Sequence, residues 1–261
     1  MENTSLYDEN LCFKIHSLYE EYKIFIEDDS LPHFKIQFIE KDGTYAYFNS
    51  NDLEDNKYVL YINKKLFIYK DKFVKSILFH EFTHIYDCFT YKNQFPDDEF
   101  KELMFTYSEY HASKVELISQ IGIKSMNSRG KHFSNDINFI YKDEEMNVNN
   151  YILYPLADAL AVLEADKNEF YCDDSLEFSS KCVNTERNML YYFGKLDAAH
   201  KYFNSELIDM FEKTHPSLYD ELFSLHTLLD MNIDIRQRIS IMKTTSEEFV
   251  EAFYKHFNNS F

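Results

Sequence analysis

Two histidines and a glutamate share one five-residue stretch, His80-Glu81-Phe82-Thr83-His84. Residues four apart lie on one face of an α-helix, about 6 Å apart along its axis, so both imidazoles can reach one metal ion. Glu81 lies about 100° round the helix from His80, where its carboxylate can reach a water beside the metal. Zn²⁺ lowers the pKa of such a water toward neutrality, and Glu81 would accept its proton as general base. The stretch therefore predicts a catalytic zinc site.

The surroundings of this stretch favour a metal site over a chance match. The five-residue pattern arises by accident too often to be decisive alone. However, the segment from Lys72 to Phe89 is apolar on nearly all sides, which is typical of a helix buried at the centre of a domain. Buried histidines and a buried glutamate are costly without partners. The alternative is that both histidines are core residues satisfied by hydrogen bonds.

A catalytic zinc site needs a third protein ligand and an open coordination position. The next predicted helix offers Glu109, with the small residues Ala112 and Ser113 three and four positions later on the same face. Because small residues would let this helix approach the catalytic helix closely, we expect Glu109 to be the third ligand. His111 is the alternative, but it points about 200° away from Glu109 on a helix.

Other side chains nearby suit supporting roles. Asp87 lies three residues beyond the second histidine, where it suits a hydrogen bond to a ligand imidazole or to backbone better than direct ligation. Glu116 lies seven residues beyond Glu109 on the same face and has either this kind of role or a place on a solvated helix surface. A purely structural zinc would need a fourth protein ligand, for which Cys88 and His111 are the nearby candidates.

These residues resemble the gluzincin metallopeptidases, in which HExxH supplies two histidine ligands and a glutamate on a later helix supplies the third. The run Ser108-Glu109-x-x-Ala112-Ser113 is similar to the minimal-scaffold branch of that clan, and His84-Ile85-Tyr86-Asp87-Cys88 is similar to the mitochondrial ATP-synthase-assembly peptidases. The resemblance covers roughly residues 34 to 121. It implies a catalytic helix beside a small sheet whose edge strand binds extended substrate. The segment from Tyr58 to Asn63 is the expected edge strand.

Three short runs rich in β-branched and aromatic residues precede the catalytic helix, and each predicts a strand. They are Phe34 to Ile39, Thr44 to Phe48 and Tyr58 to Asn63. The Asp42-Gly43 dipeptide between the first two runs favours a hairpin, because both residues tolerate the positive φ angles of tight turns. An amphipathic helix is predicted before the strands, at residues 8 to 27.

Helices are predicted over most of the remaining chain. Asp71 is expected to cap the catalytic helix, and a second helix is predicted from Pro96 to about Ile121, with Gly122 at its exit. Later helices are predicted to begin at Thr185, Ser205, Pro216 and Ser246.

The predicted fold class is therefore helix-dominated α+β. We expect a zincin-like catalytic unit with a small antiparallel sheet at residues 1–125, followed by a helical C-terminal part at residues 149–261. One continuous domain is the alternative organisation.

Composition and charge disfavour several kinds of partner. The formal net charge is −18 and no basic stripe compensates it, so neither a nucleic acid nor an anionic membrane is expected to bind. No apolar run reaches the roughly eighteen residues of a membrane-spanning helix, and no signal peptide is recognisable. Four cysteines are too few for a disulfide framework, so reduced thiols and a cytoplasmic location are expected.

The expected function is zinc-dependent hydrolysis of peptide bonds in a peptide or protein substrate. Zn²⁺ is the expected cofactor, with Glu81 as general base and then general acid. The alternative is a non-catalytic regulatory or partner-binding protein that binds zinc on the same scaffold. The oxyanion-stabilising residue, the cleavage specificity, the role of the C-terminal part and the oligomeric state stay open.

Overall fold

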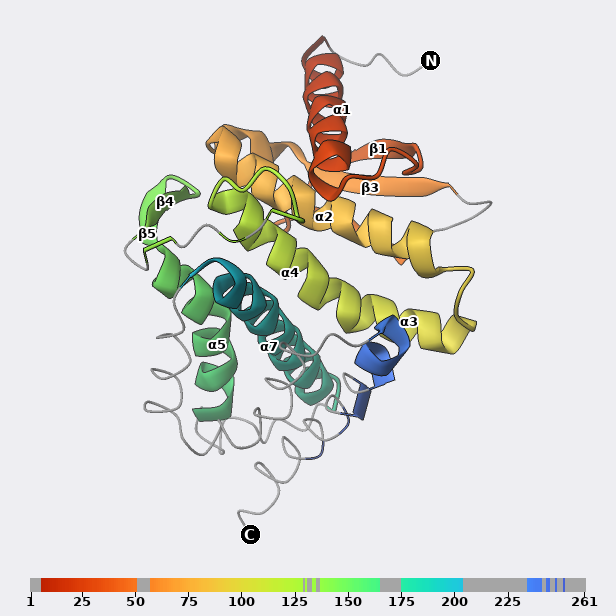
Figure 1. Ribbon diagram of the computed structural model, residues 1–261, viewed down its shortest axis with the longest axis vertical. Helices are drawn as coiled ribbons and strands as arrows, with labels where there is room; N and C mark the ends of the chain where they lie inside the picture. Colours follow the sequence, from red (N-terminus) through yellow and green to blue (C-terminus); the bar gives the residue numbers. More distant parts are fainter. Residues whose placement is uncertain are drawn as a thin grey trace. The chain divides into compact units, whose positions relative to one another are not determined.

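A computed structural model describes residues 6–50, 57–128, 130, 133–134, 137–164, 175–203, 234–240, 243–244, 247 and 251 of the chain. Within these residues the protein is mixed α+β and dominated by helices, with small sheets, as predicted (Figure 1). None of the described helices is both long and apolar enough to cross a membrane. In chain order the elements are α1 (Leu6–Ile26), β1 (Phe34–Ile39), β2 (Ala46–Phe48), β3 (Tyr58–Asn63), the 3₁₀ helix η2 (Lys64–Ile68), α2 (Asp71–Tyr91), α3 (Asp97–Phe105), α4 (Tyr107–Gln120), β4 (Asn138–Tyr141), β5 (Glu144–Asn147), α5 (Val148–Glu164) and α7 (Ser175–Tyr202).

Residue contacts divide the chain into two units. The first contains residues 1–100, 115–130 and 139–146, and the second contains residues 101–114, 131–138 and 147–261. Helix α4 belongs to both, because its residues up to 114 group with the second unit and those from 115 with the first. The predicted division into residues 1–125 and 149–261 stays a prediction.

The sheet of the first unit has the strand order β1-β3-β2. β1 pairs with β3 in parallel and β2 pairs with β3 antiparallel. The predicted hairpin between the first two strands is therefore wrong, and the sheet is mixed rather than antiparallel. Asn63 explains the difference: its backbone N–H donates to the Tyr45 carbonyl at 2.8 Å and its side-chain amide donates to the Lys41 carbonyl at 2.9 Å. Both bonds attach the turn around Gly43 (φ 75°) to the end of β3. The prediction that β3 is an edge strand is also wrong, because it lies at the centre.

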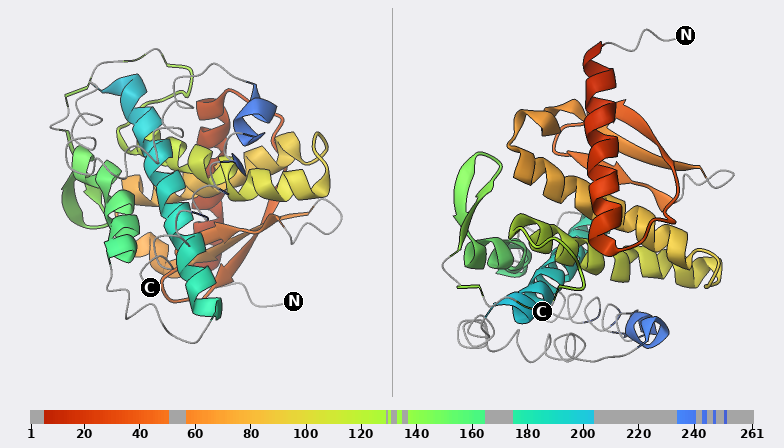
Figure 2. Two further views of the ribbon diagram at one scale, coloured as in Figure 1. Left: turned by 90° about the horizontal axis from the view of Figure 1, so that it is seen from below. Right: turned by 45° about the horizontal axis from the view of Figure 1, so that its top comes forward.

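Helix α1 packs against α2 and the sheet through aromatic side chains. The ring centroids of Tyr19 and Phe34 are 4.8 Å apart, and those of Tyr22 and Phe79 are 5.2 Å apart. The Tyr22 hydroxyl donates to Thr83 Oγ1 at 3.1 Å, so the second variable residue of the histidine motif faces α1. Figure 2 shows α1 running across α2 and the sheet. These contacts bury α2 as its apolar composition predicts.

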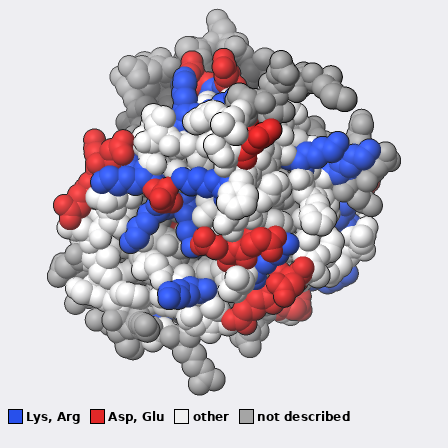
Figure 3. All heavy atoms as spheres, turned by 90° about the horizontal axis from the view of Figure 1, so that it is seen from above, with Lys and Arg blue, Asp and Glu red and all other residues white. Residues whose placement is uncertain are grey.

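Charges on the surface of the first unit are largely paired. Lys14 lies 2.6 Å from Asp71, and Lys75 lies 2.7 Å from Glu21. Figure 3 shows acidic and basic side chains intermingled on the face that it draws. Asp71 is the first residue of α2, so the prediction that it caps the helix is wrong. The N-cap is Lys70, whose side chain makes no capping hydrogen bond.

The helix predicted from Pro96 to Ile121 is interrupted at Thr106, between α3 and α4. The Thr106 hydroxyl donates to the Glu102 carbonyl at 2.7 Å, in competition with the backbone N–H that also donates there. Such back-bonding bends helices. Gly122 follows α4 with φ 80° and its N–H donates to the Ser119 carbonyl, so it ends the helix as predicted.

In the second unit, α7 packs alongside α5 (Figure 1). α7 begins at Ser175, so the helix start predicted at Thr185 is wrong by almost three turns. The starts predicted at Ser205, Pro216 and Ser246 lie outside the described residues.

The β4–β5 hairpin was not predicted, because its turn uses Lys142 at φ 56° rather than a glycine.

Candidate metal centre

The histidine motif lies in the middle of α2, in the interior of the first unit. His80, Glu81 and His84 are each buried, with 7–8% of their surface exposed. The two imidazole rings have centroids 5.0 Å apart and an interplanar angle of 77°. The i, i+4 spacing therefore places both rings on one face of the helix, as the sequence predicts.

A carboxylate oxygen of Glu109 lies close to both rings. One donor atom from each of His80, His84 and Glu109 lies within 4.8 Å of the other two. Glu109 is in the first turn of α4, and the last turn of α4 contacts α2 where Gln120 donates to the Ser76 hydroxyl at 2.6 Å.

These three donors fit a divalent metal ion. Two imidazole nitrogens and one carboxylate oxygen suit a catalytic transition metal, and Zn²⁺ in particular, when one position stays open. A tetrahedral site with arms of about 2.1 Å needs donors about 3.4 Å apart. Small side-chain rotations provide this from separations of up to 4.8 Å.

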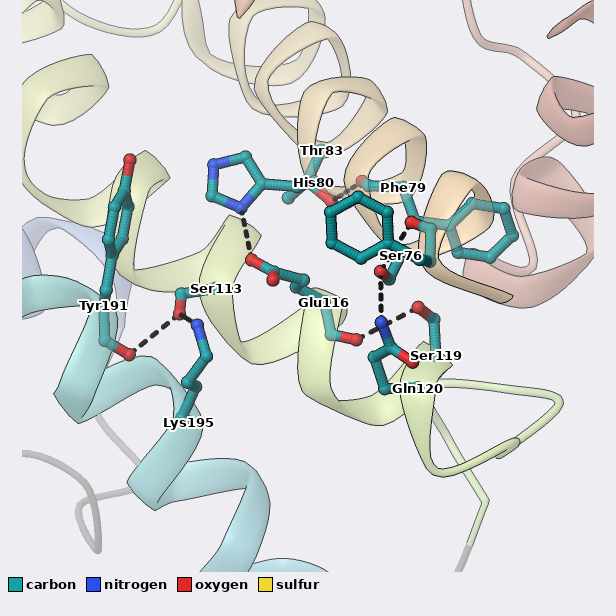
Figure 4. A network of polar contacts seen from close by, with 11 residues as sticks. Ser76, Phe79, His80, Thr83, Ser113, Glu116, Ser119, Gln120, Tyr191 and Lys195 are labelled. Carbon is teal, nitrogen blue, oxygen red and sulfur yellow. Dashed lines mark hydrogen bonds and ion pairs between the residues drawn. The ribbon is translucent and has the colours of Figure 1, made fainter. Parts of the chain in front are cut away.

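Glu116 contacts the first histidine directly. Its Oε2 lies 3.1 Å from His80 Nδ1, and both side chains are only 10% exposed. Figure 4 shows Glu116 projecting from α4 toward this nitrogen, while the other ring nitrogen points away. A carboxylate accepts a hydrogen bond from Nδ1–H, which leaves His80 Nε2 as the nitrogen available to a metal. Of the two places considered for Glu116, the structure shows contact with the His80 imidazole rather than a solvated helix surface.

Glu81 is oriented by the sheet. Its Oε2 accepts a hydrogen bond from the Phe48 backbone N–H in β2 at 2.9 Å. The Tyr45 carbonyl accepts from Asn63 of β3, and Tyr47 lies opposite Tyr61. Backbone groups alternate in direction along a strand, so those of Ala46 and Phe48 point away from β3. Among the described residues no strand pairs with this side of β2, and it faces Glu81.

The other residues considered as ligands lie outside this group of donors. Asp87 is fully buried one turn beyond His84, and its supporting role stays a prediction. His111 is buried with its ring 5.4 Å from the Tyr107 ring. Among the described residues, the group of donors contains neither His111 nor Cys88. Burial raises the pKa of the Cys88 thiol to about 12, which disfavours the thiolate that a metal requires.

Ser113 does not have the role predicted for it. Its hydroxyl donates to the Tyr191 carbonyl at 2.8 Å and accepts from Lys195 Nζ at 3.0 Å, so it faces α7 rather than α2 (Figure 4). Ser113 lies four residues after Glu109 and is displaced from it by about 40° round the helix, which is enough for its side chain to contact a different helix. The Phe48 N–H that donates to Glu81 was not predicted. The contact is long-range, and no local spacing indicates it.

No model of a known protein family matches the chain, and no curated protein and no solved structure matches it. A function therefore has to follow from the chemistry of these residues.

Proposed function

We propose that the chain is a zinc-dependent metallopeptidase of the gluzincin type, with its catalytic unit built on a zincin-like arrangement of α2, α4 and the small sheet. The observation that carries the proposal is the convergence of His80, His84 and Glu109 donor atoms within 4.8 Å, with a glutamate adjacent to the first histidine in sequence. Two histidines and a glutamate that leave a position open are the donor set of several zinc peptidases.

Each residue of the group has a separate task. His80, His84 and Glu109 would hold Zn²⁺, and Glu116 keeps the His80 ring in one orientation. Zinc, when bound, supplies Lewis acidity that lowers the pKa of water and polarises a carbonyl. Glu81 accepts a proton from the attacking water and then donates it to the nitrogen of the leaving amine. Its hydrogen bond from Phe48 N–H keeps the carboxylate directed along the edge of β2.

The substrate is an extended segment of a peptide or protein. An extended segment gains affinity from main-chain hydrogen bonds when it pairs with an exposed strand edge. The edge of β2 is suitable because it lies beside Glu81. The Phe48 N–H already donates to Glu81, so the substrate would pair with the outward backbone groups of Ala46 and with the Phe48 carbonyl. β2 therefore takes the role that the sequence assigned to the segment from Tyr58 to Asn63.

The proposal is tested by comparing Glu81→Gln with wild type. Gln retains an oxygen that can accept from Phe48 N–H, but it cannot accept a proton from water, so zinc content stays the same and cleavage stops. Zinc is measured by elemental analysis after dialysis, and cleavage is measured by mass spectrometry on a proteome-derived peptide library. Glu99→Gln, at an exposed position in α3, is the matched control and should cleave like wild type.

Three outcomes separate the possible functions. Cleavage by Glu81→Gln at the wild-type rate would show that the mechanism is wrong. Bound zinc without cleavage by wild type would favour the non-catalytic zinc-binding protein. Absence of stoichiometric zinc from wild type would refute both.

A further inference from the structure

An arginine from α7 contacts the proposed third ligand. Arg187 Nε lies 3.3 Å from Glu109 Oε1. Both residues belong to the second unit, so this ion pair is internal to it. The Glu109 side chain is 15% exposed and the Arg187 side chain is 39% exposed. The carboxylate is therefore mostly removed from water, in surroundings where a charge needs a partner.

The two helices that carry this pair are closely fitted. At Gly194 of α7, an added Cβ would lie 2.9 Å from the Lys114 backbone nitrogen and closer still to the Tyr110 carbonyl oxygen. The Tyr110 hydroxyl donates to Asp197 Oδ2 at 2.7 Å. The close fit at Gly194 keeps the two helices that carry Arg187 and Glu109 near one another.

We propose that Arg187 is a positioning residue for the third metal ligand, an inference that rests on the proposed function. A Glu side chain has three rotatable bonds, and a guanidinium is a planar, permanently charged partner that restricts them. The contact is an ion pair without hydrogen-bond geometry, so the attraction between the two charges holds the Glu109 carboxylate toward α7 before a metal binds. The C-terminal half thereby contributes, through α7, a partner for the proposed ligand Glu109 within the second unit.

The positive charge of Arg187 and its orienting role have opposite effects on zinc affinity. A cation beside the site repels a divalent metal ion, so removing the charge alone would strengthen metal binding. Removing a group that orients a ligand typically weakens metal affinity by about 10- to 100-fold. The sign of the change in zinc affinity therefore distinguishes positioning from simple electrostatics.

The test measures zinc affinity of the full chain by competition with a chromophoric chelator, for wild type, Arg187→Ala and Arg187→Lys. We expect Arg187→Ala to bind zinc about 10- to 100-fold more weakly, and Arg187→Lys to recover part of the loss. Arg236→Ala removes the same charge from an exposed position in the second unit and should bind zinc like wild type. Urea unfolding in EDTA measures the effect of each change on the metal-free fold.

Several results would overturn the inference. Equal or tighter zinc binding by Arg187→Ala excludes positioning, and an altered KM with unchanged zinc affinity assigns the arginine to substrate instead. A large loss of urea resistance in EDTA, with no recovery of zinc affinity in Arg187→Lys, would assign it to folding alone. Wild type that binds zinc but cleaves nothing refutes the peptidase and leaves the Arg187 result standing. Wild type that binds no zinc refutes both.

Discussion

The contact between Glu116 and His80 supplies the most direct prediction about the metal centre. Glu116→Ala removes the carboxylate that lies 3.1 Å from His80 Nδ1 in a part of the first unit where both side chains are 10% exposed. Zinc affinity should fall by about 10- to 100-fold, because the ring loses the partner that fixes its orientation and raises its basicity. This corresponds to about 1.4–2.8 kcal/mol of binding free energy.

Glu116→Gln separates orientation from charge. Its amide oxygen can still accept from Nδ1–H, so the ring stays oriented while the negative charge is lost. The expected loss of zinc affinity is therefore smaller than for Glu116→Ala. In the metal-free chain, Glu116→Ala should also lower the free energy of unfolding by about 1–3 kcal/mol, because a buried N–H loses its partner.

The assay is chelator competition at neutral pH, with urea unfolding in EDTA as the measure of the metal-free fold. Glu99→Ala removes the same charge from an exposed position in the first unit, and its zinc affinity should equal that of wild type. Unchanged zinc affinity in Glu116→Ala would refute the role of this contact. An equal loss in Glu99→Ala would assign the effect to net charge instead.

Two further predictions concern packing and pH. Gly194→Ala should lower the free energy of unfolding in urea by about 1–3 kcal/mol, because the added Cβ meets the backbone of α4 and the overpacking outweighs a helix-propensity gain of about 1 kcal/mol. Burial raises the pKa of the Cys88 thiol from 9.0 to about 12. At pH 8 the thiolate fraction is then about 10⁻⁴, so iodoacetamide should label Cys88 at least about 100-fold more slowly in the native than in the urea-unfolded chain. Because the unfolded thiol ionises first, the stability that Cys88 contributes is complete below pH 9 and is lost as the pH rises toward 12.

Both predictions have matched controls. Ser180→Ala, at an exposed position of α7, should change stability by only a few tenths of a kcal/mol. Increased stability of Gly194→Ala would contradict the close helix contact. Cys88→Ala should show a shallower loss of stability above pH 9 than wild type, and equal slopes would show that the thiol is not the group responsible.

Local spacing was sufficient to predict the elements that carry the candidate site. The i, i+4 histidines, their apolar neighbours and the helix with Glu109 depend on a periodicity of a few residues, which is visible in any stretch of chain. The strands β1 and β3 were also predicted with the observed bounds, because β-branched and aromatic residues gather there. A single side-chain competition explains one failure, because the Thr106 hydroxyl interrupts the helix predicted from Pro96 to Ile121.

The strand order and the contacts that orient the site residues depend on segments far apart in the sequence, so only the tertiary structure shows them. The central place of β3 follows from hydrogen bonds of Asn63 to the preceding turn. The orientation of Glu81 comes from the Phe48 N–H, Arg187 of α7 lies beside Glu109, and Gly194 lets α7 approach α4 closely. The sequence by itself therefore determined which residues of this protein could bind a metal. Which side chains orient them was decided by long-range packing, since residues far apart in the chain have no spacing rule that brings them together.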